Sequence, residues 1–147
     1  MAKEIERKFL VTGDYQPYIG ESHQICQGYL NTDPDRTVRV RILDNQGFLT
    51  VKTRNEGCVR NEWEYSIPVE DARMMLDACA AKIEKTRHII ESDNGLKWEV
   101  DVFGGRNSGL VVAEIELPSP DTPFDRPAWL GNEVTGDSRY YNSSLAS

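Results

Sequence analysis

The sequence is organised as eight short blocks in which polar and apolar residues alternate, and this pattern restricts the fold more than any other feature. Alternating residues place their side chains on opposite faces of an extended strand. Turn-forming residues separate the blocks, for example at residues 45–47 and 104–105. We therefore predict eight β-strands, at residues 3–11, 23–31, 37–43, 48–54, 60–67, 83–90, 96–103 and 110–117.

Most connections between the predicted strands are of hairpin length, which favours antiparallel pairing. Eight antiparallel strands favour a sheet that closes into a barrel. Residues 70–81 break the alternation, because they combine good helix formers, an acidic start and apolar residues at helical spacing. These residues predict a helix packed on the sheet, and the expected class is β-rich α+β with a single domain over residues 1–147.

The remainder of the chain, after Pro118, contains three further prolines before residue 128. We expect a surface loop there, followed by a tail from Glu133 that forms at most a short helix.

Composition excludes several classes of protein. A formal net charge of −7 argues against a general surface for nucleic acid or acidic membrane. The cysteines, at positions 26, 58 and 79, have no C-x-x-C spacing, so neither a disulfide framework nor a thiolate zinc site is indicated. No apolar run reaches transmembrane length and the first residues lack a signal-peptide core. We expect a cytoplasmic protein.

Most predicted strands carry two charges of the same sign on one face. Such a face is ordinary on a half-solvated sheet, but like charges two residues apart repel each other and need a compensating partner. The basic pairs are Arg39 with Arg41, Lys52 with Arg54, and Lys85 with Arg87. The acidic groups are Glu4 and Glu6 (with Lys8 on the same face), Glu62 and Glu64, Glu99 and Asp101, and Glu114 and Glu116.

Clustered arginine and lysine side chains suit a polyanion, because they donate charge-assisted hydrogen bonds to phosphate oxygens. Clustered carboxylates without histidine suit hard divalent cations, Mg²⁺ or Mn²⁺. The combination indicates a site for phosphate plus metal. Periodicity alone leaves open whether this face looks into the barrel or out of it.

The motif formed by Glu4, Glu6 and Lys8 resembles the E-x-E-x-K signature of the CYTH superfamily, the triphosphate tunnel metalloenzymes. The resemblance continues in ordered motifs along the chain: VRVR at 38–41, TVK at 50–52, EWEY at 62–65, KTR at 85–87, WEVDVF at 98–103 and AEIEL at 113–117. It implies a tunnel whose lumen holds the charged residues. The outward apolar faces then need cover from the helix, the C-terminal segment or a second subunit, which makes a homodimer one expectation.

The resemblance also implies a role for each charged residue. Lys8, Tyr29, Glu62 and Glu64 are assigned to catalysis, Lys8 near the reacting phosphorus and Tyr29 as its partner. The alternative for Tyr29 is a ring that only packs in the barrel. Binding of triphosphate is assigned to Lys8, Arg39, Arg41, Lys52, Lys85 and Arg87. Arg54 is expected at the rim of the site. Metal or water positioning is assigned to Glu4, Glu6, Glu62, Glu64, Glu99, Asp101, Glu114 and Glu116.

The expected function is metal-dependent hydrolysis of inorganic triphosphate, a small-molecule substrate, to diphosphate and phosphate, with Mg²⁺ or Mn²⁺ as cofactor. The short chain and a tail that resembles short bacterial members favour this substrate. A class IV-type adenylyl cyclase and a thiamine or nucleoside triphosphatase are alternatives within the same family. An alternative of another class is a non-catalytic module that binds triphosphate or polyphosphate.

Overall fold

A computed structural model describes residues 3–31, 33 and 35–146. Its strands are β1 (Lys3–Val11), β2 (Glu21–Tyr29), β3 (Arg36–Leu43), β4 (Gln46–Thr53), β5 (Val59–Ile67), β6 (Lys82–Glu91), β7 (Lys97–Phe103), β8 (Val111–Glu116) and β9 (Leu130–Glu133). The α-helices are α1 (Val69–Ala78) and α2 (Asn142–Leu145), and short 3₁₀ turns lie at Gln16–Tyr18, Asp93–Gly95, Gly105–Asn107 and Ser138–Tyr140. The eight predicted strands and the predicted helix are confirmed, with small differences at their ends.

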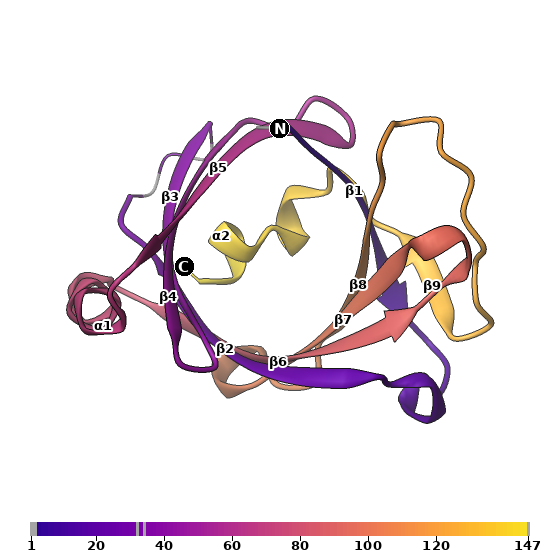
Figure 1. Ribbon diagram of the computed structural model, residues 1–147, viewed down its shortest axis with the longest axis horizontal. Helices are drawn as coiled ribbons and strands as arrows, with labels where there is room; N and C mark the ends of the chain where they lie inside the picture. Colours follow the sequence, from indigo (N-terminus) through magenta and orange to yellow (C-terminus); the bar gives the residue numbers. More distant parts are fainter. Residues whose placement is uncertain (1–2, 32, 34, 147) are drawn as a thin grey trace.

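The strands form one antiparallel sheet that closes on itself (Figure 1). The order β5-β4-β3-β2-β6-β7-β8-β1 is completed by pairing of β1 with β5, where Glu4 lies opposite Arg60. Closure leaves no free edge within these eight strands. The predicted eight-stranded antiparallel barrel is therefore confirmed.

The ninth strand corrects the expectation of a loop after Pro118. Strand β9 pairs with the C-terminal end of β1, with Phe9 opposite Glu133 and Val11 opposite Leu130. Gly131 permits this approach, because a Cβ atom there would lie 3.0 Å from the carbonyl oxygen of Leu10. Pairing with an existing strand, rather than local alternation, produces β9.

Two apolar clusters cover the outside of the barrel, as a charged lumen requires. Helix α1 places Ala72 and Leu76 over Val40 of β3. On another side, Trp129 and the loop before β9 cover outward residues of four strands. That cluster contains Phe9, Ile90, Trp98, Val100, Ala113, Ile115, Leu117 and Trp129.

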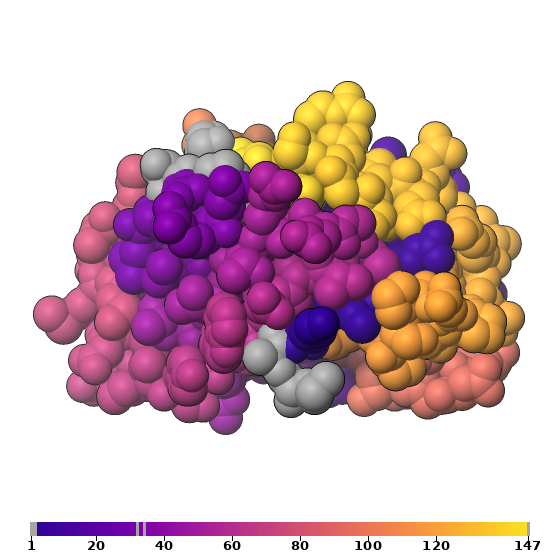
Figure 2. Space-filling model, turned by 90° about the horizontal axis from the view of Figure 1, so that it is seen from above, coloured from indigo at the N-terminus to yellow at the C-terminus, as the bar shows by residue number. Residues whose placement is uncertain are grey.

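A third apolar cluster fills one end of the barrel from the inside. Ile83, Phe103 and Val112 lie on the same strand faces as the charged residues and pack with Ala146 and Leu145. Figure 1 shows α2 within the ring of strands. In Figure 2 the C-terminal segment, in yellow, forms one end of the molecule. The barrel therefore has a charged interior and is closed at one end by this third cluster, which we call the apolar plug.

Candidate active site

The interior of the barrel holds a cavity of about 250 Å³. All but two of its lining residues are charged, the exceptions being Leu43 and Asn142. The charged residues are Glu4, Glu6, Arg39, Arg41, Lys52, Glu62, Glu64, Arg87, Glu99, Glu114 and Glu116. These side chains share one strand face because they lie at even spacing along their strands. The expectation that the charged faces point into the barrel is confirmed.

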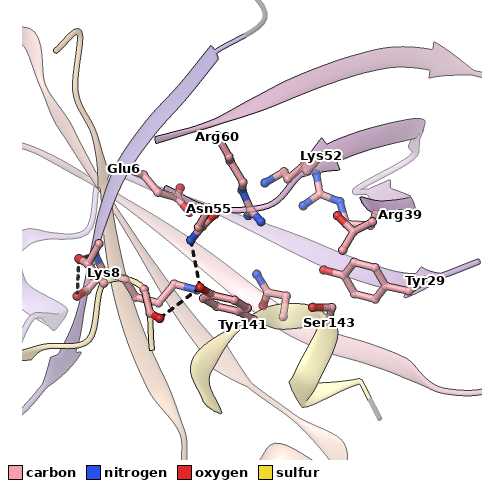
Figure 3. Close-up of a pocket in the computed structure, with 13 residues that line it drawn as sticks. Glu6, Lys8, Tyr29, Arg39, Lys52, Asn55, Arg60, Tyr141 and Ser143 are labelled. Carbon is pink, nitrogen blue, oxygen red and sulfur yellow. Dashed lines mark hydrogen bonds between the residues drawn. The ribbon is translucent and has the colours of Figure 1, made fainter. Parts of the chain in front are cut away.

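Next to this cavity, toward the plugged end, lies a smaller space of about 30 Å³, which we call the inner chamber (Figure 3). The two spaces share four lining residues: Glu6, Arg39, Lys52 and Asn142. The remaining walls of the inner chamber are Lys8, Tyr29, Thr37, Asn55, Arg60, Thr135, Gly136, Tyr141 and Ser143. The C-terminal tail thus forms one side of this chamber.

Glu4 is the acceptor for two basic groups. Its Oε1 atom accepts from Lys52 Nζ and from Arg60 Nε, each at 3.1 Å. Burial alone would raise the pKa of Glu4, but Lys52, a hydrogen bond from Glu62 and Arg60 together lower it to about 2. Burial and that same contact with Glu4 raise the pKa of Glu62. The pKa values of Glu4 and Glu62 are therefore shifted in opposite directions, and Lys52 Nζ also lies 3.1 Å from Glu62 Oε2.

A second pair of carboxylates, Glu6 and Glu114, also shares a hydrogen bond. Burial, the charges of Glu114 and Glu4, and that bond raise the pKa of Glu6 well above its usual value. The pKa of Glu114 lies well below its usual value, because Lys8 and the bond from Glu6 outweigh the effect of burial. Lys8 Nζ lies 3.7 Å from Glu114 Oε1. The pKa values of these two buried carboxyl groups are therefore shifted in opposite directions.

The chemistry of this donor set fits a hard divalent cation. Glu4, Glu6, Glu62, Glu114 and Glu116 line one cavity, and the pKa of Glu116 is raised by burial and by neighbouring carboxylates. A divalent cation bound among these carboxylates relieves their mutual repulsion while using the oxygen ligands that Mg²⁺ and Mn²⁺ prefer. In the described part of the chain no three such side chains already converge closely enough to hold an ion. Binding would require side-chain rearrangement.

The basic groups of the cavity differ in how far carboxylates neutralise them. Arg87 is held by Asp101 through two hydrogen bonds of 2.8 and 2.9 Å and by Glu99 at 3.2 Å. Arg41 instead donates to the neutral Gln27 at 2.8 Å, and among the described residues it has no carboxylate partner within 4.0 Å. Burial and the charges of Arg39 and Arg87 lower the pKa of Arg41 to about 9.

Arg39 is also only weakly compensated. Its Nη2 atom lies 3.5 Å from Glu64 and 3.2 Å from the hydroxyl of Thr50, and its buried Nε has no partner in the described part of the chain. Arg39 and Arg41 are therefore the buried cations with most capacity left for an anion.

Two predicted site residues lie on the luminal face but do not line the cavity. Lys85 and Asp101 form a buried ion pair of 2.6 Å, with side chains 0% and 1% exposed. Lys85 Nζ also lies 3.4 Å from Asn142 Oδ1 and over the ring of Phe103. Burial opposes the ionised form of Asp101, yet Arg87 and Lys85 hold its pKa far below the usual range. In this structure the pair supports Arg87 rather than lining the cavity.

Lys8 and Tyr29 both line the inner chamber, but on opposite sides of it (Figure 3). Lys8 Nζ donates to the carbonyl of Tyr140 in the tail at 3.0 Å. Tyr29 packs against the apolar plug, and no hydrogen bond between Tyr29 and Lys8 is found in the described part of the chain. The Tyr29 side chain thus packs against the apolar plug and also lines the inner chamber.

Sequence reasoning missed several residues of the site. Arg60 precedes Glu62 by two positions, so it shares the same strand face. This even spacing could have identified it from the sequence. The same holds for Gln27 and Thr50, which hold Arg41 and Arg39. No local pattern indicated that Asn142 of the tail reaches both cavities.

The CYTH domain model matches residues 2–145. The chain belongs to the CYTH domain family. It is 48% identical over 147 residues to an inorganic triphosphatase of Acetivibrio thermocellus, covering 99% of this chain and 94% of that protein. An inorganic triphosphatase of Nitrosomonas europaea is 40% identical, with 97% and 96% covered.

A solved crystal structure of an inorganic triphosphatase superposes with a TM-score of 0.70 at 37% identity, covering 99% of this chain and 95% of the other. The CYTH barrel and its motifs thus extend over the whole of the described chain. No helix in the described ranges is long and apolar enough to cross a membrane.

Proposed function

We propose that this CYTH protein hydrolyses inorganic triphosphate to diphosphate and phosphate inside the barrel. The observation that carries this proposal is the cavity of about 250 Å³, in which poorly compensated arginines face surplus carboxylates. Relatives named inorganic triphosphatases, at 48% and 40% identity over nearly the whole chain, support the same reaction.

Members of this family require a divalent metal, and we propose Mg²⁺ or Mn²⁺ as the ion. The proposed ligands are Glu4, Glu6, Glu114 and Glu116, with Glu62 and Glu64 for a second ion or the attacking water and Glu99 as an outer contributor. When bound, the metal supplies positive charge to the phosphate oxygens. Asp101 is better placed to hold Arg87 and Lys85 than to bind metal directly.

Hydrolysis of a phosphoanhydride asks the protein mainly for positioning and charge stabilisation. Arg39 and Arg41 bind the phosphate chain, with Lys52 and Arg87 beside them on the cavity wall. Water attacks the terminal phosphorus, the bond to the bridging oxygen breaks, and the leaving diphosphate retains the electron pair. Lys8, with Tyr29 across the chamber, stabilises the charge that develops at the reacting phosphoryl group.

The lining of the cavity argues against the organic alternatives. A nucleoside or thiamine ring is usually bound by apolar and aromatic side chains. This cavity offers charged groups plus Leu43 and Asn142. A binding module without turnover would need the arginines but not the carboxylate pairs, which compete with an anion unless a metal is present.

A phosphate-release assay tests the proposal directly. Inorganic triphosphate, ATP, thiamine triphosphate and diphosphate are each supplied with Mg²⁺, Mn²⁺ or EDTA. We expect metal-dependent release from inorganic triphosphate at the highest kcat/KM. Faster turnover of ATP or thiamine triphosphate, formation of cyclic AMP, or tight triphosphate binding without release would overturn the assignment.

We further propose a single domain that acts in the cytoplasm on this small molecule, without nucleic acid or membrane. A homodimer is proposed through the outer face of β5, where Trp63 and Tyr65 are 39% and 61% exposed. Sedimentation of the wild type and of Tyr65→Lys tests it, and a monomeric wild type would refute it.

A further inference from the structure

Arg60 is the basic residue of the site that no sequence motif assigned. It lies on the same face of β5 as Glu62 and Glu64, opposite Glu4 of β1. Its side chain is 20% exposed and lines the inner chamber. Figure 3 shows Arg60 among Glu6, Asn55 and Lys52, on the side of the chamber away from the tail.

Arg60 contacts one carboxylate, Glu4, among the described residues, and does so through a single nitrogen. Its Nε shares one oxygen, Glu4 Oε1, with Lys52 Nζ. Its two terminal nitrogens make no hydrogen bond with another residue of the described ranges. Glu4 therefore contacts both cations, and Lys52 Nζ also lies 3.1 Å from Glu62 Oε2. The planar end of the Arg60 guanidinium, which suits phosphate oxygens, remains available.

The inner chamber as a whole favours an anion. Its basic lining residues are Lys8, Arg39, Lys52 and Arg60, whereas its acidic lining residue is Glu6. The space of about 30 Å³ suffices for roughly two water-sized groups. Tyr141 and Ser143 of the tail close it. Two oxygen atoms of a phosphoryl group fit this chamber, but an organic group attached to such an oxygen does not.

We propose that Arg60 is a substrate-binding residue which, together with Lys8, holds the oxygens of a free terminal phosphoryl group in the inner chamber. This inference rests on the proposed function. It makes an unsubstituted phosphoryl end a requirement of recognition, because that end enters first and meets the closed side of the barrel. A triphosphate with organic groups on both ends is therefore excluded, whereas one with a single free end enters.

Binding without metal isolates this role from catalysis. Calorimetric titration with inorganic triphosphate in EDTA compares the wild type with Arg60→Gln, Arg60→Lys and Arg54→Gln, the last being an exposed arginine just after β4. We expect Arg60→Gln to weaken binding about ten- to a hundredfold, which corresponds to loss of charge-assisted hydrogen bonds. Arg60→Lys should recover part of the affinity, and Arg54→Gln should bind as the wild type does.

The wild type alone gives a second test, which does not depend on the folding of any variant. Diadenosine triphosphate, with both ends esterified, should fail to compete with inorganic triphosphate, while ATP should compete. Unchanged affinity of Arg60→Gln, or effective competition by diadenosine triphosphate, would overturn the inference and leave triphosphate hydrolysis intact. Absence of both binding and phosphate release in the wild type would instead overturn the proposed function.

Discussion

Replacing Asp101 by asparagine tests whether this residue holds the cationic wall together or serves as a metal ligand. The carboxylate is 1% exposed and accepts three charge-assisted hydrogen bonds, from Lys85 at 2.6 Å and from Arg87 at 2.8 and 2.9 Å. Asparagine keeps the shape but removes the charge, so two buried cations lose their main counter-charge. Removing one partner of such a buried pair costs about 3–5 kcal/mol of unfolding free energy.

Urea denaturation in EDTA measures that loss, with the slope m expected to stay unchanged. The corresponding decrease in Tm is roughly 10 °C for a chain of this size. Asp77→Asn is the matched control, because Asp77 is 80% exposed and its contact with Lys82, at 3.6 Å, contributes little. A loss below about 1 kcal/mol for Asp101→Asn would refute the supporting role. Reduced metal affinity with unchanged stability would favour a ligand role instead.

Arg41→Gln should raise KM for triphosphate by at least about tenfold. It should leave stability nearly unchanged, because Arg41 has no carboxylate partner in the described chain. Steady-state kinetics and urea denaturation check this, and an unchanged KM would contradict it. Leu145→Asp should lower stability by about 2–5 kcal/mol, because it places a charge in the apolar plug; a Tm equal to the wild type's would contradict that packing. Hydrogen bonding to Arg7 lowers the pKa of Glu133, so this contact stabilises the fold above the unfolded pKa and is lost as pH falls through the folded one. In Glu133→Gln the unfolding free energy should therefore decrease less steeply with falling pH below about pH 4.5 than in the wild type. Acid-denaturation profiles of the two proteins that run parallel would contradict this.

Strand parity was readable from the sequence because the side-chain period of a strand is two residues. It correctly grouped Arg39 with Arg41 and Glu114 with Glu116 on the luminal face. The odd or even position of a residue predicts which face of the sheet its side chain occupies, but not how far along the barrel axis that side chain lies. Lys85 shares the face of Arg87, yet it lies opposite Phe103, at the level that the apolar plug fills.

The parts that sequence reasoning missed depend on contacts between distant segments. Asn142 reaches both cavities only because the tail folds back into the barrel, and β9 forms only because β1 offers it a partner. Neither arrangement leaves a periodic signal in the residues concerned. The pairing of Glu4 with both Lys52 and Arg60 likewise requires the closure between β1 and β5.

The proposed triphosphatase reaction requires the luminal carboxylates to hold a divalent metal beside the poorly compensated arginines of the same cavity. The most direct measurement is phosphate release from inorganic triphosphate by the wild type, Glu114→Gln and Glu84→Gln, the last replacing an exposed carboxylate of β6. We predict release that EDTA abolishes, a loss of at least about a hundredfold in Glu114→Gln, as for removal of a stabilising group in the transition state, and wild-type rates in Glu84→Gln. Full metal-dependent release by Glu114→Gln would contradict the account.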